Sequence, residues 1–459
     1  MSDTLTGAGR ARSTHRFRRW ALRALLALAV VLAGVYALLW WGVLRTSEPA
    51  SWPPPADAVT ADGALVATAA FLTDEGTDVN DLGTHFAWTT AASVEPLVDG
   101  TSFYPRMLED IAAARGSVHL LQYGFTPGEV GDEFAAALEA AVARGVEVRA
   151  VVDEYGSKTG SSSEEFFDRL AAAGVQVVVS DLLPPCYRGL WPSTELDYSF
   201  AEVGHYEHRK LLVVDGRVAY TGGAGIQDHF ANGRFHDVMT RVTGDVVREL
   251  QMVFLTTFAA HGGPLDRGEP ALAAYFPEPD DPGALRTIVV GTRHTRDVSA
   301  LQATRELIDT AQQRIDVTNP YFTDDEIVDH VITAAERGVR VRILVAQDSN
   351  SAVHSAALRH DYGRLLEAGV ELWEYPNAVV HGKVLVADDA VMFGTINLDA
   401  WALYRAYEVA VLVDDRGTAD LFEERLFEPD IAISRPGVAP DDAWTRLKDQ
   451  LADALSYFL

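Results

Sequence analysis

The sequence has 459 residues, enough for two or three domains or for one large duplicated core. Its composition, 48% hydrophobic and 23% charged, is typical of a globular protein, while a single cysteine, Cys186, excludes an internal disulfide framework. The formal net charge of −28 disfavours nucleic acid as a partner, because an acidic protein repels polyanions. Cysteine and histidine are nowhere spaced as in a zinc site, so we expect neither a metal nor another cofactor.

The first predicted element is a membrane anchor within residues 1–45. Residues 24–44 form a stretch of 21 residues without a charged side chain, about the number that a helix needs to cross ~30 Å of hydrocarbon. Six arginines precede this stretch, so the positive-inside rule places the amino terminus in the cytoplasm and the rest of the chain outside the cell membrane. A cleaved signal peptide is the alternative. Residues 46–62, rich in proline and alanine, are predicted to form a linker.

Beyond the linker the sequence predicts an internally duplicated α/β fold, with one half at residues 63–280 and the other at residues 281–459. Short β-branched runs alternate with amphipathic helical stretches in the same order in both halves. The matching runs are 117–125, 144–153, 173–179 and 208–223 in the first half, and 314–322, 337–346, 368–376 and 381–395 in the second. This alternation predicts two mainly parallel sheets flanked by helices, with the active site on a pseudo-twofold axis.

A histidine motif of the form HxKxxxxD occurs once in each half, at matched places. Its residues are His208, Lys210 and Asp215 in the first half and His381, Lys383 and Asp388 in the second. Side chains two positions apart on a strand point to one face, so each histidine and its lysine can reach one phosphate. A neutral imidazole can attack phosphorus, an ammonium can neutralise the developing charge, and a second imidazole can transfer protons. Only four residues of the chain are lysines, and two of them occupy the motif, which argues against a chance repeat.

The paired motif resembles that of the phospholipase D superfamily, and the segments 208–223, 319–326, 393–400 and 407–415 are similar to segments of bacterial cardiolipin synthases. The resemblance extends from Thr101 to the end of the chain. It implies transfer of a phosphatidyl group between phospholipids such as phosphatidylglycerol, with His208 as the nucleophile that forms a phosphohistidine and His381 as the general acid and base. It further implies residues that orient the imidazoles or bind phosphate, namely Gly222, Gly223, Asp237, Thr395, Asn397 and Glu408. Asp215 and Asp388 are expected to brace the motif loops.

One position departs from the pattern of the family. Gly225 stands where that pattern has an asparagine, whereas Asn397 keeps the asparagine in the second half. One side chain that would contact phosphate is therefore missing, and this loss could lower the activity or change the acceptor. Three other functions stay open: a hydrolytic phospholipase D, in which water is the acceptor; a nuclease or soluble phosphodiesterase, which the acidic charge disfavours; and a lipid-binding scaffold without activity.

Overall fold

The structure is a computed structural model of the chain, and it describes residues 54, 57–73, 85–157, 161–180, 206–266, 268–293 and 297–456. The predicted anchor at residues 1–45 lies outside these ranges, as does most of the predicted linker at 46–62. Within the described ranges, no helix is both long enough and apolar enough to cross a membrane.

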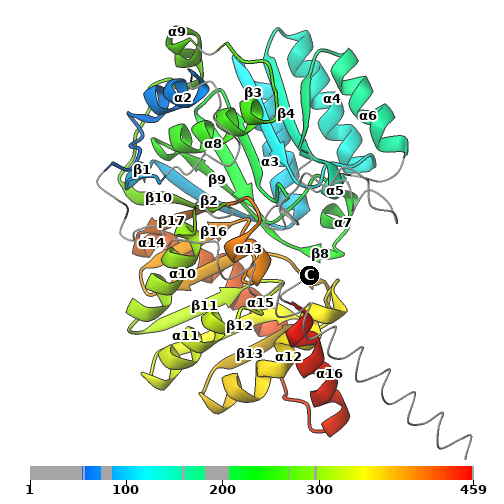
Figure 1. Ribbon diagram of the computed structural model, residues 1–459, viewed down its shortest axis with the longest axis vertical. Coiled ribbons are helices and arrows are strands. Elements are labelled where there is room, and N and C mark those ends of the chain that lie inside the picture. Colours follow the sequence, from blue (N-terminus) through cyan, green and yellow to red (C-terminus); the bar gives the residue numbers. More distant parts are fainter. Residues whose placement is uncertain are drawn as a thin grey trace, which may run out of the picture. The chain divides into compact units, whose positions relative to one another are not determined.

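The first half builds a sheet whose strands pair in the order β2-β9-β7-β6-β3-β4-β5 (Figure 1). These strands are β2 (Ser93–Val98), β3 (Ser117–Gln122), β4 (Glu147–Asp153), β5 (Gln176–Ser180), β6 (Lys210–Val214), β7 (Val218–Gly222) and β9 (Val238–Thr243). The helices are α2 (Ala64–Thr73), α3 (Gly100–Ala113), α4 (Glu129–Ala143), α5 (Glu154–Ser157), α6 (Ser161–Ala172), α7 (Asp228–Ala231), α8 (Val246–Ala260) and α9 (Glu269–Leu272). Helix α4 forms because Val130, Phe134 and Leu138 recur at helical spacing and are buried on one face.

The second half repeats this arrangement in a sheet with the order β1-β10-β17-β16-β15-β11-β12-β13-β18. Its strands are β1 (Thr89–Ala91), β10 (Leu285–Thr292), β11 (Arg314–Thr318), β12 (Arg340–Ala346), β13 (Glu371–Tyr375), β15 (Val384–Ala387), β16 (Ala390–Gly394), β17 (Glu408–Asp414) and β18 (Arg435–Pro436). Its helices are α10 (Ser299–Thr310), α11 (Asp325–Glu336), α12 (Ala352–Glu367), α13 (Ala400–Tyr404), α14 (Arg416–Phe422), α15 (Glu428–Ile433) and α16 (Ala443–Ser456). Strand β1 belongs to this sheet although it precedes β2 in the chain.

Both sheets are mixed, and the prediction of mainly parallel sheets was wrong. Strands β3, β4 and β5 pair in parallel, as do β11, β12 and β13, but the strands that follow each motif pair antiparallel. The reason is a tight turn after β6, in which Asp215 and Gly216 have φ angles of 53° and 63°. The N–H of Arg217 closes this turn by donating to the carbonyl of Val214 over 3.0 Å. A tight turn of this kind joins antiparallel strands, because parallel strands need a long crossover connection.

The buried apolar side chains form three clusters, arranged as layers around the two sheets. Leu211 and Val213 of β6 face a central cluster that also receives Val386 from the second sheet and the apolar face of α8. Leu212 and Val214 of the same strand face an outer cluster formed with α3, α4 and α6, which cover the outer face of the first sheet (Figure 1). The third cluster lies between the second sheet and helices α10, α11 and α12. Because side chains alternate along a strand, β6 contributes to both the central cluster and the outer cluster.

The two halves also exchange backbone hydrogen bonds just before each motif histidine. Strand β14 (Val379–Val380) pairs in parallel with β8 (Phe235–His236), and the N–H of His381 donates to the carbonyl of His236 over 2.7 Å. The symmetry-related contact is a bridge between Glu207 and Tyr407, where the N–H of His208 donates to the carbonyl of Tyr407 over 3.1 Å. Each motif histidine is therefore held in place by the opposite half.

Candidate active site

The first motif places a histidine and a lysine together at the start of β6. Both residues are buried, and the ammonium of Lys210 donates to the carbonyl of His208 over 2.5 Å. The ring of Tyr123 contacts the imidazole of His208 edge-on at 4.6 Å between centroids and lies 4.7 Å from the Lys210 ammonium. Tyr206 contacts the same imidazole from another side at 5.4 Å. The sequence motif thus forms a compact pair with aromatic walls.

The second motif repeats this arrangement before β15. The ammonium of Lys383 donates to the carbonyl of His381 over 2.5 Å and lies 3.2 Å from Nε2 of its imidazole. Phe230 and Phe235 contact the imidazole of His381, each at 5.5 Å between centroids. The side chain of His381 is 12% exposed and that of His208 is 8% exposed, so both imidazoles are shielded from bulk water.

Each imidazole is hydrogen-bonded to a carboxylate from the other half of the chain. Nδ1 of His208 lies 2.7 Å from Oε1 of Glu408, and Nδ1 of His381 lies 2.7 Å from Oδ2 of Asp237. The Thr395 hydroxyl donates to the second oxygen of Glu408. These contacts assign Nδ1 of each ring to a carboxylate and leave Nε2 as the atom that can react.

The charged groups of the two pairs affect one another's pKa values. Burial, followed by the Lys210 and Lys383 ammonium groups, holds the pKa of His208 well below its usual range. Burial and Lys383 lower the pKa of His381 to about 4. Burial also lowers the pKa of Lys210 to about 7 and that of Lys383 to about 8, against the opposing effect of the carboxylates. Burial raises the pKa of Glu408. Both imidazoles are thus neutral around pH 7.

The two motif aspartates lie at the far ends of the motif strands, away from the imidazoles. Asp215 accepts hydrogen bonds from the N–H groups of residues 115, 116 and 117 over 2.9, 2.7 and 2.9 Å. Asp388 accepts the equivalent bonds from residues 312, 313 and 314 over 2.7, 2.8 and 3.0 Å. Both aspartates therefore brace the loops that precede β3 and β11.

The predicted glycines and amide lie beside the imidazole–carboxylate pairs. A Cβ atom on Gly222 would collide with the carbonyl of Val238, and one on Gly223 would stand 2.6 Å from the carbonyl of His381. Close pairing of β7 with β9 therefore requires glycine at position 222, and close approach of the two halves requires it at position 223. Asn397 is buried, and its Oδ1 has no hydrogen-bond partner among the described residues.

The aromatic residues that line the site were not predicted from the sequence. Tyr123 directly follows the carboxyl end of β3, an edge where ligands of α/β sheets commonly bind, so its position was a usable signal. Phe235 and Tyr206 reach the site because the segments that carry them pair with the opposite half. Such long-range pairing leaves no local pattern in the sequence.

An imidazolium joins the halves immediately behind Asp237. Nδ1 of His236 lies 2.9 Å from Asp99, Nε2 lies 2.7 Å from Asp430 in the second half, and the ring stacks on Tyr375 at 4.7 Å. Despite burial, these two carboxylates raise the pKa of His236 to about 10. His236 is therefore charged at neutral pH and fixes the backbone that carries Asp237.

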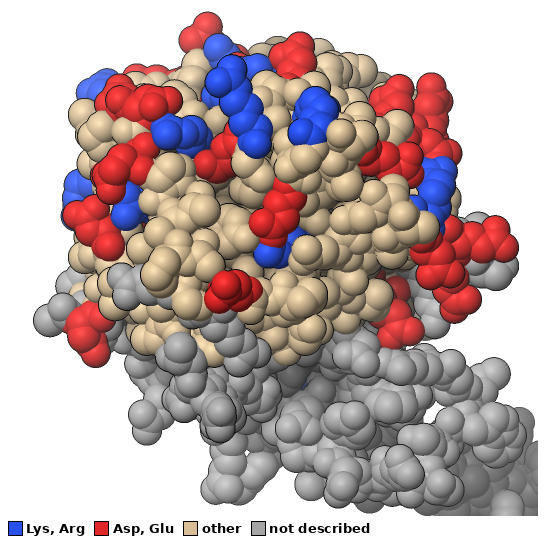
Figure 2. Space-filling model, turned by 90° about the horizontal axis from the view of Figure 1, so that it is seen from above, with Lys and Arg blue, Asp and Glu red and all other residues tan. Residues whose placement is uncertain are grey.

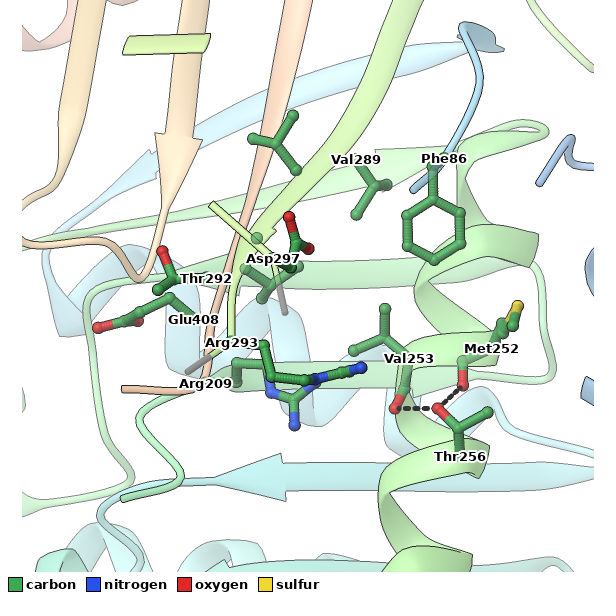
Figure 3. A pocket seen from close by; sticks show the side chains of 13 residues that line it. Phe86, Arg209, Met252, Val253, Thr256, Val289, Thr292, Arg293, Asp297 and Glu408 are labelled. Carbon is green, nitrogen blue, oxygen red and sulfur yellow. Dashed lines mark hydrogen bonds between the residues drawn. The ribbon is translucent and has the colours of Figure 1, made fainter. Parts of the chain in front are cut away.

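A small cavity lies on the other side of Glu408. Arg209 and Arg293 lie next to one another in this cavity, whereas Glu408 directs its carboxylate away from both (Figure 3). Glu207 accepts hydrogen bonds from Arg209 over 2.6 and 2.5 Å and so neutralises that guanidinium. The carboxylate of Glu408 thus remains available to His208.

Comparison with known proteins identifies similar sequences. A family model described as "Cardiolipin synthase, PLD-like domain" matches residues 107–254 and 304–429, more than half of the chain. Cardiolipin synthase A of Yersinia pseudotuberculosis serotype O:1b (strain IP 31758) is 28% identical over 363 residues, covering 77% of this chain and 72% of that protein. Cardiolipin synthase A of Yersinia pestis bv. Antiqua (strain Angola) matches to the same extent.

The fold has a counterpart among solved structures. Phosphatidylserine synthase of Haemophilus influenzae Rd KW20 superposes with a TM-score of 0.61 at 15% sequence identity, covering 83% of this chain and 98% of that one. At this level of identity the likeness concerns the fold alone. The match to the family model, over more than half of the chain, shows that the chain belongs to the family of cardiolipin synthases and phospholipase D-like domains.

Proposed function

We propose that this protein transfers a phosphatidyl group from one phospholipid to the alcohol of another, as in the synthesis of cardiolipin from two phosphatidylglycerols. The observation that carries this proposal is the meeting of two imidazole–lysine pairs, each with a carboxylate from the opposite half. Two imidazoles whose Nε2 atoms are not bonded to the carboxylates provide one nucleophile and one proton carrier, which is the minimum for transfer in two steps.

In the proposed reaction Nε2 of His208 attacks the phosphorus of the donor lipid. A P–N bond forms, the P–O bond to the leaving glycerol breaks, and His381 gives its proton to the departing oxygen. The hydroxyl of the acceptor lipid then gives a proton to His381 and attacks phosphorus, so that the P–N bond breaks and His208 is restored. Lys210 and Lys383 neutralise the non-bridging oxygens in both steps. The negative charge of a bound phosphodiester raises the pKa of His381 and so favours its protonated form.

The membrane is the proposed place of reaction. The uncharged stretch at residues 24–44 supports a single membrane-spanning anchor, and the arginines before it support a catalytic domain outside the cytoplasm. An anchored site meets phospholipid headgroups directly. Hydrolysis by the same residues requires only that water replace the acceptor alcohol, and the product decides between the two reactions.

Cleavage of nucleic acid is less well supported. On the face seen in Figure 2, Lys and Arg side chains are scattered among Asp and Glu and do not form a continuous band. The chain as a whole has a formal charge of −28. Binding of a phosphate backbone relies on grooves lined with basic side chains, so the charge pattern favours a lipid substrate.

The decisive experiment supplies the purified full-length protein, in detergent micelles, with phosphatidylglycerol alone. We expect cardiolipin and free glycerol in equal amounts. Formation of phosphatidic acid and glycerol would show that the reaction is hydrolysis and not transfer. Unchanged lipid would refute both activities on phosphatidylglycerol. Addition of a chelator is expected to leave the rate unchanged.

The pH dependence of kcat/KM should follow the two lysines and the nucleophile His208. Lowered lysine pKa values mean that the ammonium groups are present at acidic pH and are lost as the pH rises through about 7 and about 8. The lowered pKa of His208 means that its imidazole stays neutral, and able to attack phosphorus, until the pH falls well below the usual range of histidine. We therefore expect a bell-shaped profile, measured from pH 3 to 10 as initial rates at low substrate. A flat profile between pH 7 and 9 would exclude a role for the lysine charges.

A further inference from the structure

The loops that follow β7 and β16 are symmetry-related, but they differ at one functional position. Phe125 pairs with Ile226 in the first half and Phe322 pairs with Leu398 in the second, which fixes the register between the loops. Gly225 and Asn397, each one residue before the bridged position, are therefore equivalent. The buried amide of Asn397 has an oxygen without a hydrogen-bond partner among the described residues, whereas the first half has no side chain at this place. An unpaired buried amide is costly unless a ligand or water completes it.

Gln227, two residues further along, occupies the space that the missing side chain leaves. A Cβ atom on Gly225 would stand 2.8 Å from Oε1 of Gln227, and a Cβ atom on Gly124 would stand 2.6 Å from the same atom. The amide of Gln227 thus lies over two glycines that come from different loops. Any larger residue at either position would displace it.

The position of Gln227 at the start of α7 explains why its side chain can lie against Gly124 and Gly225. Gln227 precedes α7 in an extended conformation, with φ −149° and ψ 144°, and its side chain makes no capping hydrogen bond. Its equivalent before α13, Asp399, accepts a capping bond from the N–H of Ala402 over 2.8 Å. Asp399 therefore caps its helix in the second half, whereas the equivalent residue in the first half, Gln227, does not use its side chain as a cap.

The two glycines under this amide belong to segments that line the active site. Gly124 directly follows Tyr123, whose ring contacts both His208 and Lys210. Gly225 follows Gly223, which abuts the carbonyl of His381. The N–H of Ile226 donates to the carbonyl of Gly124 over 2.7 Å, so the two segments are joined at this point.

We propose that the side-chain amide of Gln227 contacts the lipid phosphodiester in the first half, in the role that Asn397 has in the second. This inference rests on the proposed function. The Nε2–H group of Gln227 would donate to a non-bridging phosphate oxygen, and a hydrogen bond to a charged group of this kind is worth about 10–100-fold in kcat/KM.

The test compares Gln227→Ala, Gln227→Glu and Gln227→Asn in the full-length protein, with micellar phosphatidylglycerol and quantification of the lipid products. We expect Gln227→Ala to lower kcat/KM about 10–100-fold and Gln227→Asn to lower it less. Gln227→Glu should be at least as damaging as Gln227→Ala, because a carboxylate repels the phosphodiester although it fills the same space. A residue that only fills space would show the opposite order.

Two controls separate the possible outcomes. Gln313→Glu makes the same charge change on an exposed residue in the loop before β11, at the far end of the motif strand, and should leave kcat/KM unchanged. Equal melting temperatures of the variants exclude loss of folding as the cause. If the wild type is active and Gln227→Glu matches it within twofold, the role of Gln227 is refuted while the proposed function stands. If the wild type forms no lipid product, both are refuted.

Discussion

Replacing either His208 or His381 by asparagine should lower turnover of phosphatidylglycerol by at least about 10⁴-fold. Asparagine is close to histidine in size and can keep a hydrogen bond to Glu408 or Asp237, but it provides neither a nucleophilic nitrogen nor a proton carrier near neutral pH. The neighbouring lysines cannot substitute, because each ammonium already donates to a backbone carbonyl over 2.5 Å. Initial rates of lipid product formation measure this effect.

The double variant should be no worse than either single variant, because the two imidazoles act in one reaction cycle. His330→Asn is the matched control. His330 is partly exposed on α11, bonds to Asp309 over 2.6 Å and takes no part in the site, so its loss should leave the rate within twofold of wild type. Retention of a tenth of the wild-type rate by either motif variant would rule out a mechanism with two histidines.

Glu408→Gln and Asp237→Asn should each lower kcat by about 10²–10⁴-fold with little change in KM. An amide in place of either carboxylate presents N–H to Nδ1, because its oxygen is kept in place by other donors: the Thr395 hydroxyl on Glu408 and the Val238 N–H on Asp237. The imidazole would then carry its proton on Nε2, the nitrogen that must react.

Steady-state kinetics together with melting temperatures test this expectation. Asp309→Asn, which alters a surface carboxylate that bonds only to a surface histidine among the described contacts, serves as the control and should keep full activity. Rates within threefold of wild type for both site variants would show that the carboxylates do not set the tautomers. A fall confined to Glu408→Gln would instead limit this role to the pair at His208.

The sequence predicted the duplication and the residues of the site better than it predicted their connections. The spacing of His208 and Lys210, and of their counterparts, was readable because it depends on strand geometry alone. That Glu408 serves His208 and Asp237 serves His381 was not readable, because the exchange depends on bridges between residues about 150 to 200 positions apart. The parallel sheets were predicted wrongly because the Asp-Gly turn at residues 215–216 was not given its weight as a hairpin signal.

The effect of Gly225 also depended on tertiary structure. Glycine has no side chain, and the space that an asparagine side chain would fill at position 225 is occupied by Gln227, which belongs to no recognised motif. Taken alone, position 225 of the sequence shows only that the asparagine side chain of the family pattern is missing. The compensation becomes visible when the backbone of the following helix start is known.

The reciprocal contacts between the halves bear on how the two imidazoles became different. Two identical subunits on a true twofold axis would have to give both rings the same neighbours. Here both copies lie in a single polypeptide, and each has its own surroundings, with Gly223 and Gln227 on one side and Thr395 and Asn397 on the other. In a single chain, mutation can therefore adapt one imidazole to attack phosphorus and the other to transfer protons. In a symmetric homodimer every mutation changes both imidazole sites alike.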